Sequence, residues 1–242
     1  MSDPHAKDER IAQLRSAIGA IESTTTDMAR RPPQNTTNQS APTKKPQPIR
    51  YVGMPEGEDW MQRLPIWYSD GEGGFDRRIM EELAAVGVPC YTLNDLTKAR
   101  SVPQGIPIFI DWLTHLEERI PGPETDHRQA IRGNLIRNLN DPAARGNDQA
   151  IKLLIQQLDR QPPLPAGLLD YASQALARIA TKKDFPRIAG LLAELSPNGP
   201  IGPLIEYMGK VKTPEARDIS LRYLDTDWTY FSIRALTAMK AT

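Results

Sequence analysis

Short apolar patterns alternate with polar turns through the second half of the chain. In "ALARIATKKDFPRIAGLLAEL", residues 175–195, two helical patterns flank a basic turn that contains a proline. The end of the first pattern has two packing residues, two other residues and one more apolar residue. It occurs four times, as Leu135-Ile136-x-x-Leu139, Ala175-Leu176-x-x-Ile179, Tyr207-Met208-x-x-Val211 and Ala235-Leu236-x-x-Met239. This recurrence predicts helix–turn–helix units, with an irregular helical bundle as the alternative.

A partner helix and a turn recur with these copies. The partner patterns are GIPIFIDWL, AIKLLIQQL, RIAGLLAEL and RDISLRYL. Three turns carry a proline after a polar residue, at Asp141-Pro142, Asp184-Phe185-Pro186 and Thr213-Pro214. Proline suits the first turn of a helix because its missing N–H would have no partner there. We therefore expect four helix pairs within residues 103–242.

The N-terminal part has a different composition. Residues 1–29 include an amphipathic pattern at 8–23, with Ile11, Leu14 and Ile18 on one stripe. It indicates either a fraying helix or a helix that docks on a partner or on its own domain. Residues 30–49 are rich in Pro, Thr, Asn, Gln and Lys. This composition predicts a disordered linker, because it buries too little apolar surface to offset the entropy of ordering.

Residues 50–102 predict an entry module that is partly irregular and partly helical. Residues 50–74 show no clear period, but apolar residues such as Trp60 and Trp67 should pack onto the following domain. From Phe75 the sequence FDRRIMEELAAVGVP predicts a helix. Its end is marked by Gly87 and Pro89, the usual stop signals.

Units of about 30–45 residues with a helix pair and a proline-bearing turn resemble HEAT repeats. The likeness is to the short kind known as phycobilisome-lyase HEAT-like repeats. The run EELAAVGVPCYTLNDLTKARSVPQGIPIFIDWL also resembles the entry module of bacterial, especially actinobacterial, HEAT-repeat proteins, in which a helix, an extended segment and the first repeat helix follow one another. The resemblance covers residues 78–242. It implies an all-α fold, a short HEAT-like α-solenoid of about four helix pairs.

In such a stack the second helices line the concave side, because neighbouring units bury each other's apolar faces. The polar positions between the core residues then form a mixed surface with a positive bias, which serves either as a binding surface or as a solvated helix face. The candidate binding residues are, in one row, Asn134, Gln174, Glu206 and Arg234, in a neighbouring row, Asn138, Arg178 and Lys210, and in a turn, Lys182 and Lys183.

Charge and composition narrow the class of protein. The formal net charge is zero, although residues 51–120 hold six Lys/Arg against twelve Asp/Glu. We expect no nucleic-acid partner, because a neutral chain with an acidic entry module repels phosphates. The single cysteine, Cys90, allows no intramolecular disulfide. Without a signal-peptide pattern or a long apolar run, we expect a cytoplasmic protein that does not enter the membrane.

Candidate sites for chemistry are weak. The stretch DGEGGFDRRIMEE has acidic residues at calcium-loop spacing, but Phe75 stands where such a loop needs glycine. The three histidines lack the spacing of a metal site. Asp111-Trp112 and Trp228 are the candidates for a DNA-glycosylase-like site, yet Trp112 lies within an apolar set that predicts a core position. We expect no catalytic residues, no metal and no cofactor.

The function that these features favour is a non-catalytic protein-binding scaffold that uses the concave face of the repeats. Two alternatives stay open. One is an immunity or antitoxin-like protein whose partner is an enzyme. The other is a HEAT-like enzyme that acts on DNA or, as a bilin lyase, on a chromophore.

Overall fold

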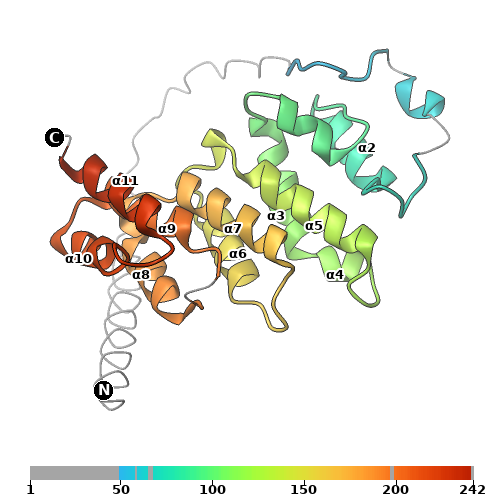
Figure 1. Ribbon diagram of the computed structural model, residues 1–242. Helices are drawn as coiled ribbons and strands as arrows, with labels where there is room; N and C mark the ends of the chain where they lie inside the picture. The colour runs from blue at the N-terminus through green and yellow to red at the C-terminus, as the bar shows by residue number, and fades with distance from the viewer. Residues whose placement is uncertain (1–48, 58, 65–67, 197–198, 241–242) are drawn as a thin grey trace, which may run out of the picture. The chain divides into compact units, whose positions relative to one another are not determined.

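The computed structural model describes residues 49–57, 59–64, 68–196 and 199–240, all within a compact unit that runs from Pro46 to Thr242. The predicted tail, the amphipathic pattern at 8–23 and most of the predicted linker lie outside the described residues. Regular structure in the described part is helical, without strands, which confirms the all-α class (Figure 1). Ile49, the last residue of the predicted linker, is buried in the core.

The described residues of the entry segment form one α-helix and three short 3₁₀ helices. The 3₁₀ helices are η1 (Trp60–Arg63), η2 (Leu93–Lys98) and η3 (Pro103–Gly105). Helix α2 (Arg77–Ala85) begins after Asp76, whose carboxylate accepts from the backbone N–H of Arg78. It ends as predicted at Gly87, which has a φ of 79° and donates its N–H to Ala84 O.

The segment that follows α2 differs from the extended one that the resemblance implies. It forms η2, because Thr92 and Asp95 make a capping box at its start. The Thr92 backbone N–H donates to Asp95 Oδ2 at 3.0 Å. This pairing satisfies donors at the helix start, so the chain turns instead of running straight.

Four helix pairs follow the entry segment in the part of the chain that the structure describes. The first helices are α3 (Ile106–Thr114), α6 (Asp148–Leu158), α8 (Phe185–Glu194) and α10 (Pro214–Arg222). The second helices are α5 (Asp126–Leu139), α7 (Ala166–Ile179), α9 (Gly202–Val211) and α11 (Thr229–Lys240). The sequence patterns anticipated these eight helices. They did not reveal α4 (Leu116–Arg119), a short extra helix between α3 and α5.

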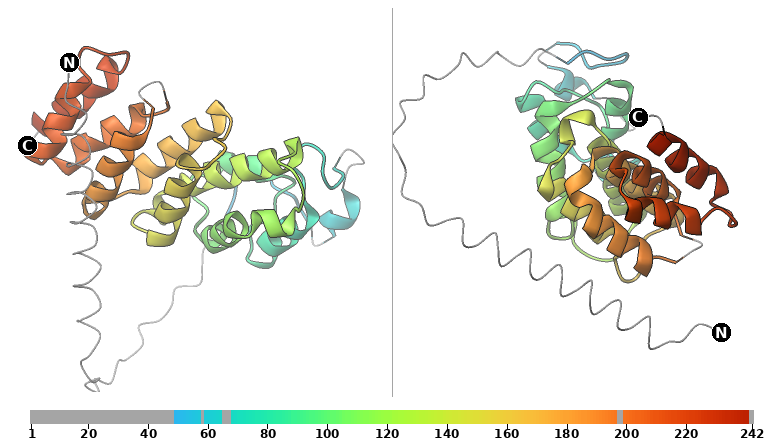
Figure 2. Two further views of the ribbon diagram at one scale, coloured as in Figure 1. Left: turned by 90° about the horizontal axis from the view of Figure 1, so that it is seen from below. Right: turned by 90° about the vertical axis from the view of Figure 1, so that its left-hand side faces the viewer.

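The second helices are neighbours in chain order. Helix α5 packs on α7, α7 on α9 and α9 on α11, and each also packs on the first helix of its own pair. Figure 1 and the left view of Figure 2 show this succession from green through yellow to red. Buried apolar residues from all four pairs belong to one continuous core.

The recurring apolar positions are the core positions of the second helices. In the first three copies every packing residue named by the pattern is buried, from Leu135 to Val211. In the fourth copy Ala235 is buried, whereas Leu236 and Met239 are half-buried. The last pair packs on α9, and α11 leaves Tyr230 61% and Ile233 52% exposed.

The proline turns begin helices, as predicted. Pro186 and Pro214 lie in the first turns of α8 and α10. Pro142 instead opens the 3₁₀ helix η4 (Pro142–Ala144), and α6 starts later, after an Asn147 cap. Asp141 fixes this turn to the entry segment, because its carboxylate accepts from Ser101 Oγ at 2.6 Å and from the Val102 N–H at 2.5 Å.

Candidate functional site

The second helices carry exposed stripes between their core positions. On α7 the stripe contains Tyr171, Gln174 and Arg178, at spacings of three and four residues, so the three side chains share one side of the helix. Equivalent stripes lie on the neighbouring helices. We call the resulting surface the second-helix face, and it consists of Arg137, Tyr171, Gln174, Arg178, Glu206, Lys210, Tyr230 and Arg234.

Contacts between the stripes show that they lie on one side of the helix series. The Arg137 guanidinium of α5 lies 5.1 Å from the ring centroid of Tyr171 on α7. Lys210 Nζ of α9 donates to Ala177 O of α7 at 2.6 Å. Arg234 of α11 pairs with Glu206 of α9 at 2.8 Å. Each neighbouring pair of second helices is therefore joined by at least one polar or cation–π contact across the face.

Of the residues predicted for the first row, Glu206 and Arg234 lie together in an ion pair, and Gln174 is exposed on α7. Asn134 is half-buried, and its amide donates to Ala130 O of its own helix at 2.9 Å. A contact therefore joins two members of the predicted row, Glu206 and Arg234, whereas the first member, Asn134, is engaged within α5.

Asn138, predicted in the second row, is only 7% exposed. Its amide donates to Leu93 O at 2.9 Å and to Asn134 O at 2.8 Å. Helix η2 packs on α5 and covers this position. Asn138 therefore holds the entry segment in place and offers no surface to a partner, while Arg178 and Lys210 from the same row are exposed.

The two predicted turn lysines lie in η5 (Lys182–Asp184), directly after α7. Both side chains are exposed. Lys183 Nζ lies 3.1 Å from Asp148 Oδ1 at the start of α6. The turn itself is fixed by a capping box between Thr181 and Asp184, so these lysines stand on a well-defined backbone at one end of α7.

Basic residues occupy the last turn of each second helix: Arg137, Arg178, Lys210 and Lys240. A cation at this end interacts favourably with the helix dipole. Partial burial lowers the pKa of the Lys210 amino group, and the charges of Arg145 and Arg178 lower it further, against the opposing effect of Glu206. Positive charge is therefore concentrated near the C-terminal ends of α7 and α9.

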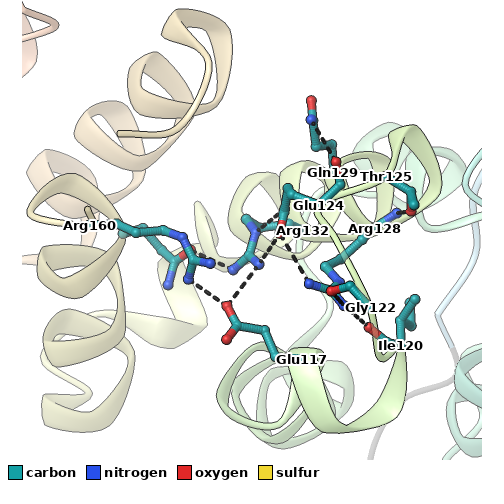
Figure 3. A network of polar contacts seen from close by, with 10 residues as sticks. Glu117, Ile120, Gly122, Glu124, Thr125, Arg128, Gln129, Arg132 and Arg160 are labelled. Atoms are coloured by element: carbon teal, nitrogen blue, oxygen red, sulfur yellow. Dashed lines mark hydrogen bonds and ion pairs between the residues drawn. The ribbon is translucent and has the colours of Figure 1, made fainter. Parts of the chain in front are cut away.

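A buried arginine network lies on the other side of α5. The Arg132 side chain is 2% exposed, and its guanidinium donates to both Glu124 oxygens, at 2.8 and 3.0 Å, and to Gln157 Oε1 at 3.0 Å. Glu117 lies 3.4 Å from Arg132 and 2.6 Å from Arg160 (Figure 3). The network thereby connects α4, α5 and α6 with the loops beside them.

The arginines keep both carboxylates of this network ionised. Hydrogen bonding to Arg160 is the main cause that lowers the pKa of Glu117, against an opposing effect of burial. Burial raises the pKa of Glu124, but the hydrogen bond and charge of Arg132, with the charges of Arg160 and Arg128, outweigh it and hold that pKa below its ordinary value. Arg128 reinforces the adjoining loop by donating to Ile120 O and, at 2.6 Å, to Gly122 O.

The residues considered above for chemistry are buried or paired within the fold. Trp112 is buried as expected, with its Nε1–H donating to Glu82 at 2.8 Å and with Arg119 4.6 Å from its ring. Asp111 pairs with Arg119. Burial is the main cause that raises the pKa of the Cys90 thiol, which disfavours the nucleophilic thiolate.

Two features that bear on function are absent from the described part of the chain. Among these residues there is no group of three or more His, Cys, Asp or Glu side chains placed to hold a metal ion. The same residues include no helix with the length and apolar character needed to cross a membrane.

A shallow pocket of about 570 Å³ lies in the entry segment, with Met54, Trp60 and Tyr91 in its lining. Arg63, which also lines it, is already paired with Asp59 at 2.7 Å. The pocket therefore offers an aromatic wall but no free arginine to fix an anion.

Arg137, Tyr171, Tyr230 and the arginine network were not among the sequence candidates. The same reasoning could have identified Tyr171, because it lies three residues before Gln174 and therefore on the same side of the helix. The sequence suggested the opposite for Arg132, since a charged residue within a helix pattern normally indicates a solvent-exposed position. Comparisons with protein-family models, with curated proteins and with solved structures give no match to this chain, so the resemblance to HEAT repeats rests on its own residues and helix order.

Proposed function

We propose that this protein is a non-catalytic protein-binding scaffold, built as a short HEAT-like solenoid whose second-helix face is the concave contact surface. The support for the solenoid is the order of contacts, in which each second helix packs on the next one along the chain. Units of this kind bury their apolar faces against their neighbours and present the remaining side for binding.

The observation that carries the proposal is the fixed arrangement of large polar and aromatic side chains across three helix junctions. Arg137 lies against Tyr171, Lys210 is bound to α7, and Glu206 is paired with Arg234. Arginine and tyrosine are enriched at the energetic centres of protein interfaces. A surface that is already ordered loses less side-chain entropy on binding, which favours affinity.

Steric blocking of the face tests this proposal without changing charge. Gln174 is exposed on α7 at the middle of the face, and Gln156 is exposed on α6 outside it. The full-length chain carrying Gln174→Trp and the chain carrying Gln156→Trp are used in affinity purification from the native cell, with quantitative mass spectrometry. We expect Gln174→Trp to lose a protein that the unmodified chain and Gln156→Trp both retain.

Equal recovery of every co-purified protein by the two tryptophan variants would show that the face is not the contact surface. Thermal unfolding of both variants, followed by circular dichroism, provides the folding control. Both positions are exposed, so their midpoints should stay close to that of the unmodified chain.

A further inference from the structure

Three cations converge at one end of the second-helix face. Arg178 and Lys210 lie in the last turns of α7 and α9. Arg145 follows η4, and its neighbour Gly146 donates its N–H to Ile179 O at 2.9 Å, which holds the Arg145 loop at the end of α7. Lys210 Nζ reaches the same end through its bond to Ala177 O. We call Arg145, Arg178 and Lys210 the basic cluster.

The cluster has little negative charge to balance it. Glu206 is the carboxylate that acts on Lys210, and its side chain is already paired with Arg234 at 2.8 Å. Asp148, at the start of α6, is paired with Lys183. Within the described residues, Arg145 and Arg178 form no ion pair with a carboxylate. One cation near a helix end complements its dipole, but three at neighbouring ends repel one another.

We propose that the basic cluster binds an acidic segment, a run of Asp or Glu residues, on the protein partner. This inference rests on the proposed function, because it describes the chemistry of that partner. Guanidinium groups bind carboxylates through paired hydrogen bonds, and two unpaired arginines beside a lysine provide several such donors. Binding also relieves the repulsion among the three cations, so the charge arrangement favours an anionic ligand.

The surroundings favour a peptide over a nucleic acid. Asp148 and Glu206 border the basic cluster, and the chain as a whole has no net charge. A nucleic acid carries a charge at every nucleotide along its length, so the strand that extends beyond the basic cluster would meet these acidic borders. An acidic segment of a protein can end within the basic cluster, so that uncharged residues of the partner follow it beyond the borders.

Fluorescence anisotropy with a fluorescein-labelled octaglutamate peptide tests the inference on the full-length chain. We expect saturable binding that weakens as salt rises. Arg145→Glu and Arg178→Glu should each weaken it by about tenfold or more, because each replaces an attraction by a repulsion. The matched control is Arg217→Glu on α10, an exposed arginine with the same change in charge, for which a change within about twofold is expected.

Three results would overturn the inference: no binding of octaglutamate, equal loss in the Arg217→Glu control, or tighter binding of a labelled oligothymidylate than of octaglutamate. Both cluster variants are checked for folding by circular dichroism. Because there are two of them, misfolding of one variant still leaves the other to test the inference. Its failure is separate from failure of the proposed function, because Gln174→Trp alters no charge and is judged by loss of a partner.

Discussion

At the scale of single residues, burial of charge distinguishes structural side chains from those available for binding. Arg132 is 1% exposed, and its guanidinium makes four hydrogen bonds, to Glu117 of α4, to Gln157 of α6 and two to Glu124 of the loop before α5. Arg178, on the neighbouring second helix, is exposed. Breaking a buried charge pair is costly, because the remaining charge cannot recover its water. Loss of a neighbouring charge should therefore lower the free energy of unfolding strongly at Arg132 and little at Arg178.

Glu124→Gln should lower the free energy of unfolding by about 3 kcal/mol at pH 7, since it removes the paired carboxylate from the buried Arg132 guanidinium. Glu118→Gln is the control, because Glu118 is exposed on α4 and should change stability by less than about 0.5 kcal/mol. Urea unfolding followed by circular dichroism measures both. An equal decrease in the free energy of unfolding of the two variants would mean that the arginine network does not stabilise the fold more than an exposed glutamate does.

The same network predicts a pH dependence. The folded-state pKa values of Glu117 and Glu124 are lowered. Their contribution to stability is therefore present above the unfolded carboxyl pKa of about 4.3 and is lost as pH falls through the lower folded-state values. The difference between the unmodified chain and Glu124→Gln should narrow below about pH 4. A difference that stays constant from pH 7 to pH 3 would contradict this explanation.

At the scale of helices, the junction between α9 and α11 depends on glycine. A Cβ on Gly209 would lie 2.9 Å from Ala235 O and 3.0 Å from the Ala238 Cβ. These atoms belong to the backbone and the short side chains of α11, so they have little freedom to move aside. Gly190, in the middle of α8, has no such neighbour within 4 Å.

Gly209→Ala should therefore destabilise the protein by about 1–3 kcal/mol through overpacking, even though alanine favours helix. Gly190→Ala should stabilise it by about 0.5–1 kcal/mol, because it gains helix propensity without a clash. Chemical unfolding of the two variants gives the comparison. A stabilising Gly209→Ala would show that α9 and α11 are not closely packed at this point.

Helix-level features were the most accessible to sequence reasoning. The triplet at Leu135, Ile136 and Leu139 gave a core stripe because local spacing decides which side of a helix faces its neighbour. The burial of Asn138 could not be seen in this way. It results from the path of η2, a segment more than forty residues away along the chain. Arg132 was hidden for the same reason, because its partners come from α4, α6 and a loop.

At the scale of the whole described unit, the helix pairs bury their apolar residues in one continuous core and leave polar stripes on the second helices. The exposed residues of the polar stripes, such as Gln174 and Arg178, lie outside the packed contacts that Gly209 and Glu124 make. We therefore expect binding and stability to be separable by mutation. Changes at exposed positions such as Gln174 should affect binding of the proposed partner, whereas changes at Gly209 or Glu124 should affect the free energy of unfolding.

Site-specific photo-crosslinking in the native cell tests protein binding by the second-helix face most directly. The photoreactive residue p-benzoylphenylalanine replaces either Gln174 on α7 or Gln156 on α6 in the full-length chain. We expect irradiation to give a discrete higher-mass protein adduct from position 174 that is absent or much weaker from position 156. Crosslinking that is equal at the two positions, or present only at position 156, would contradict protein binding by this face.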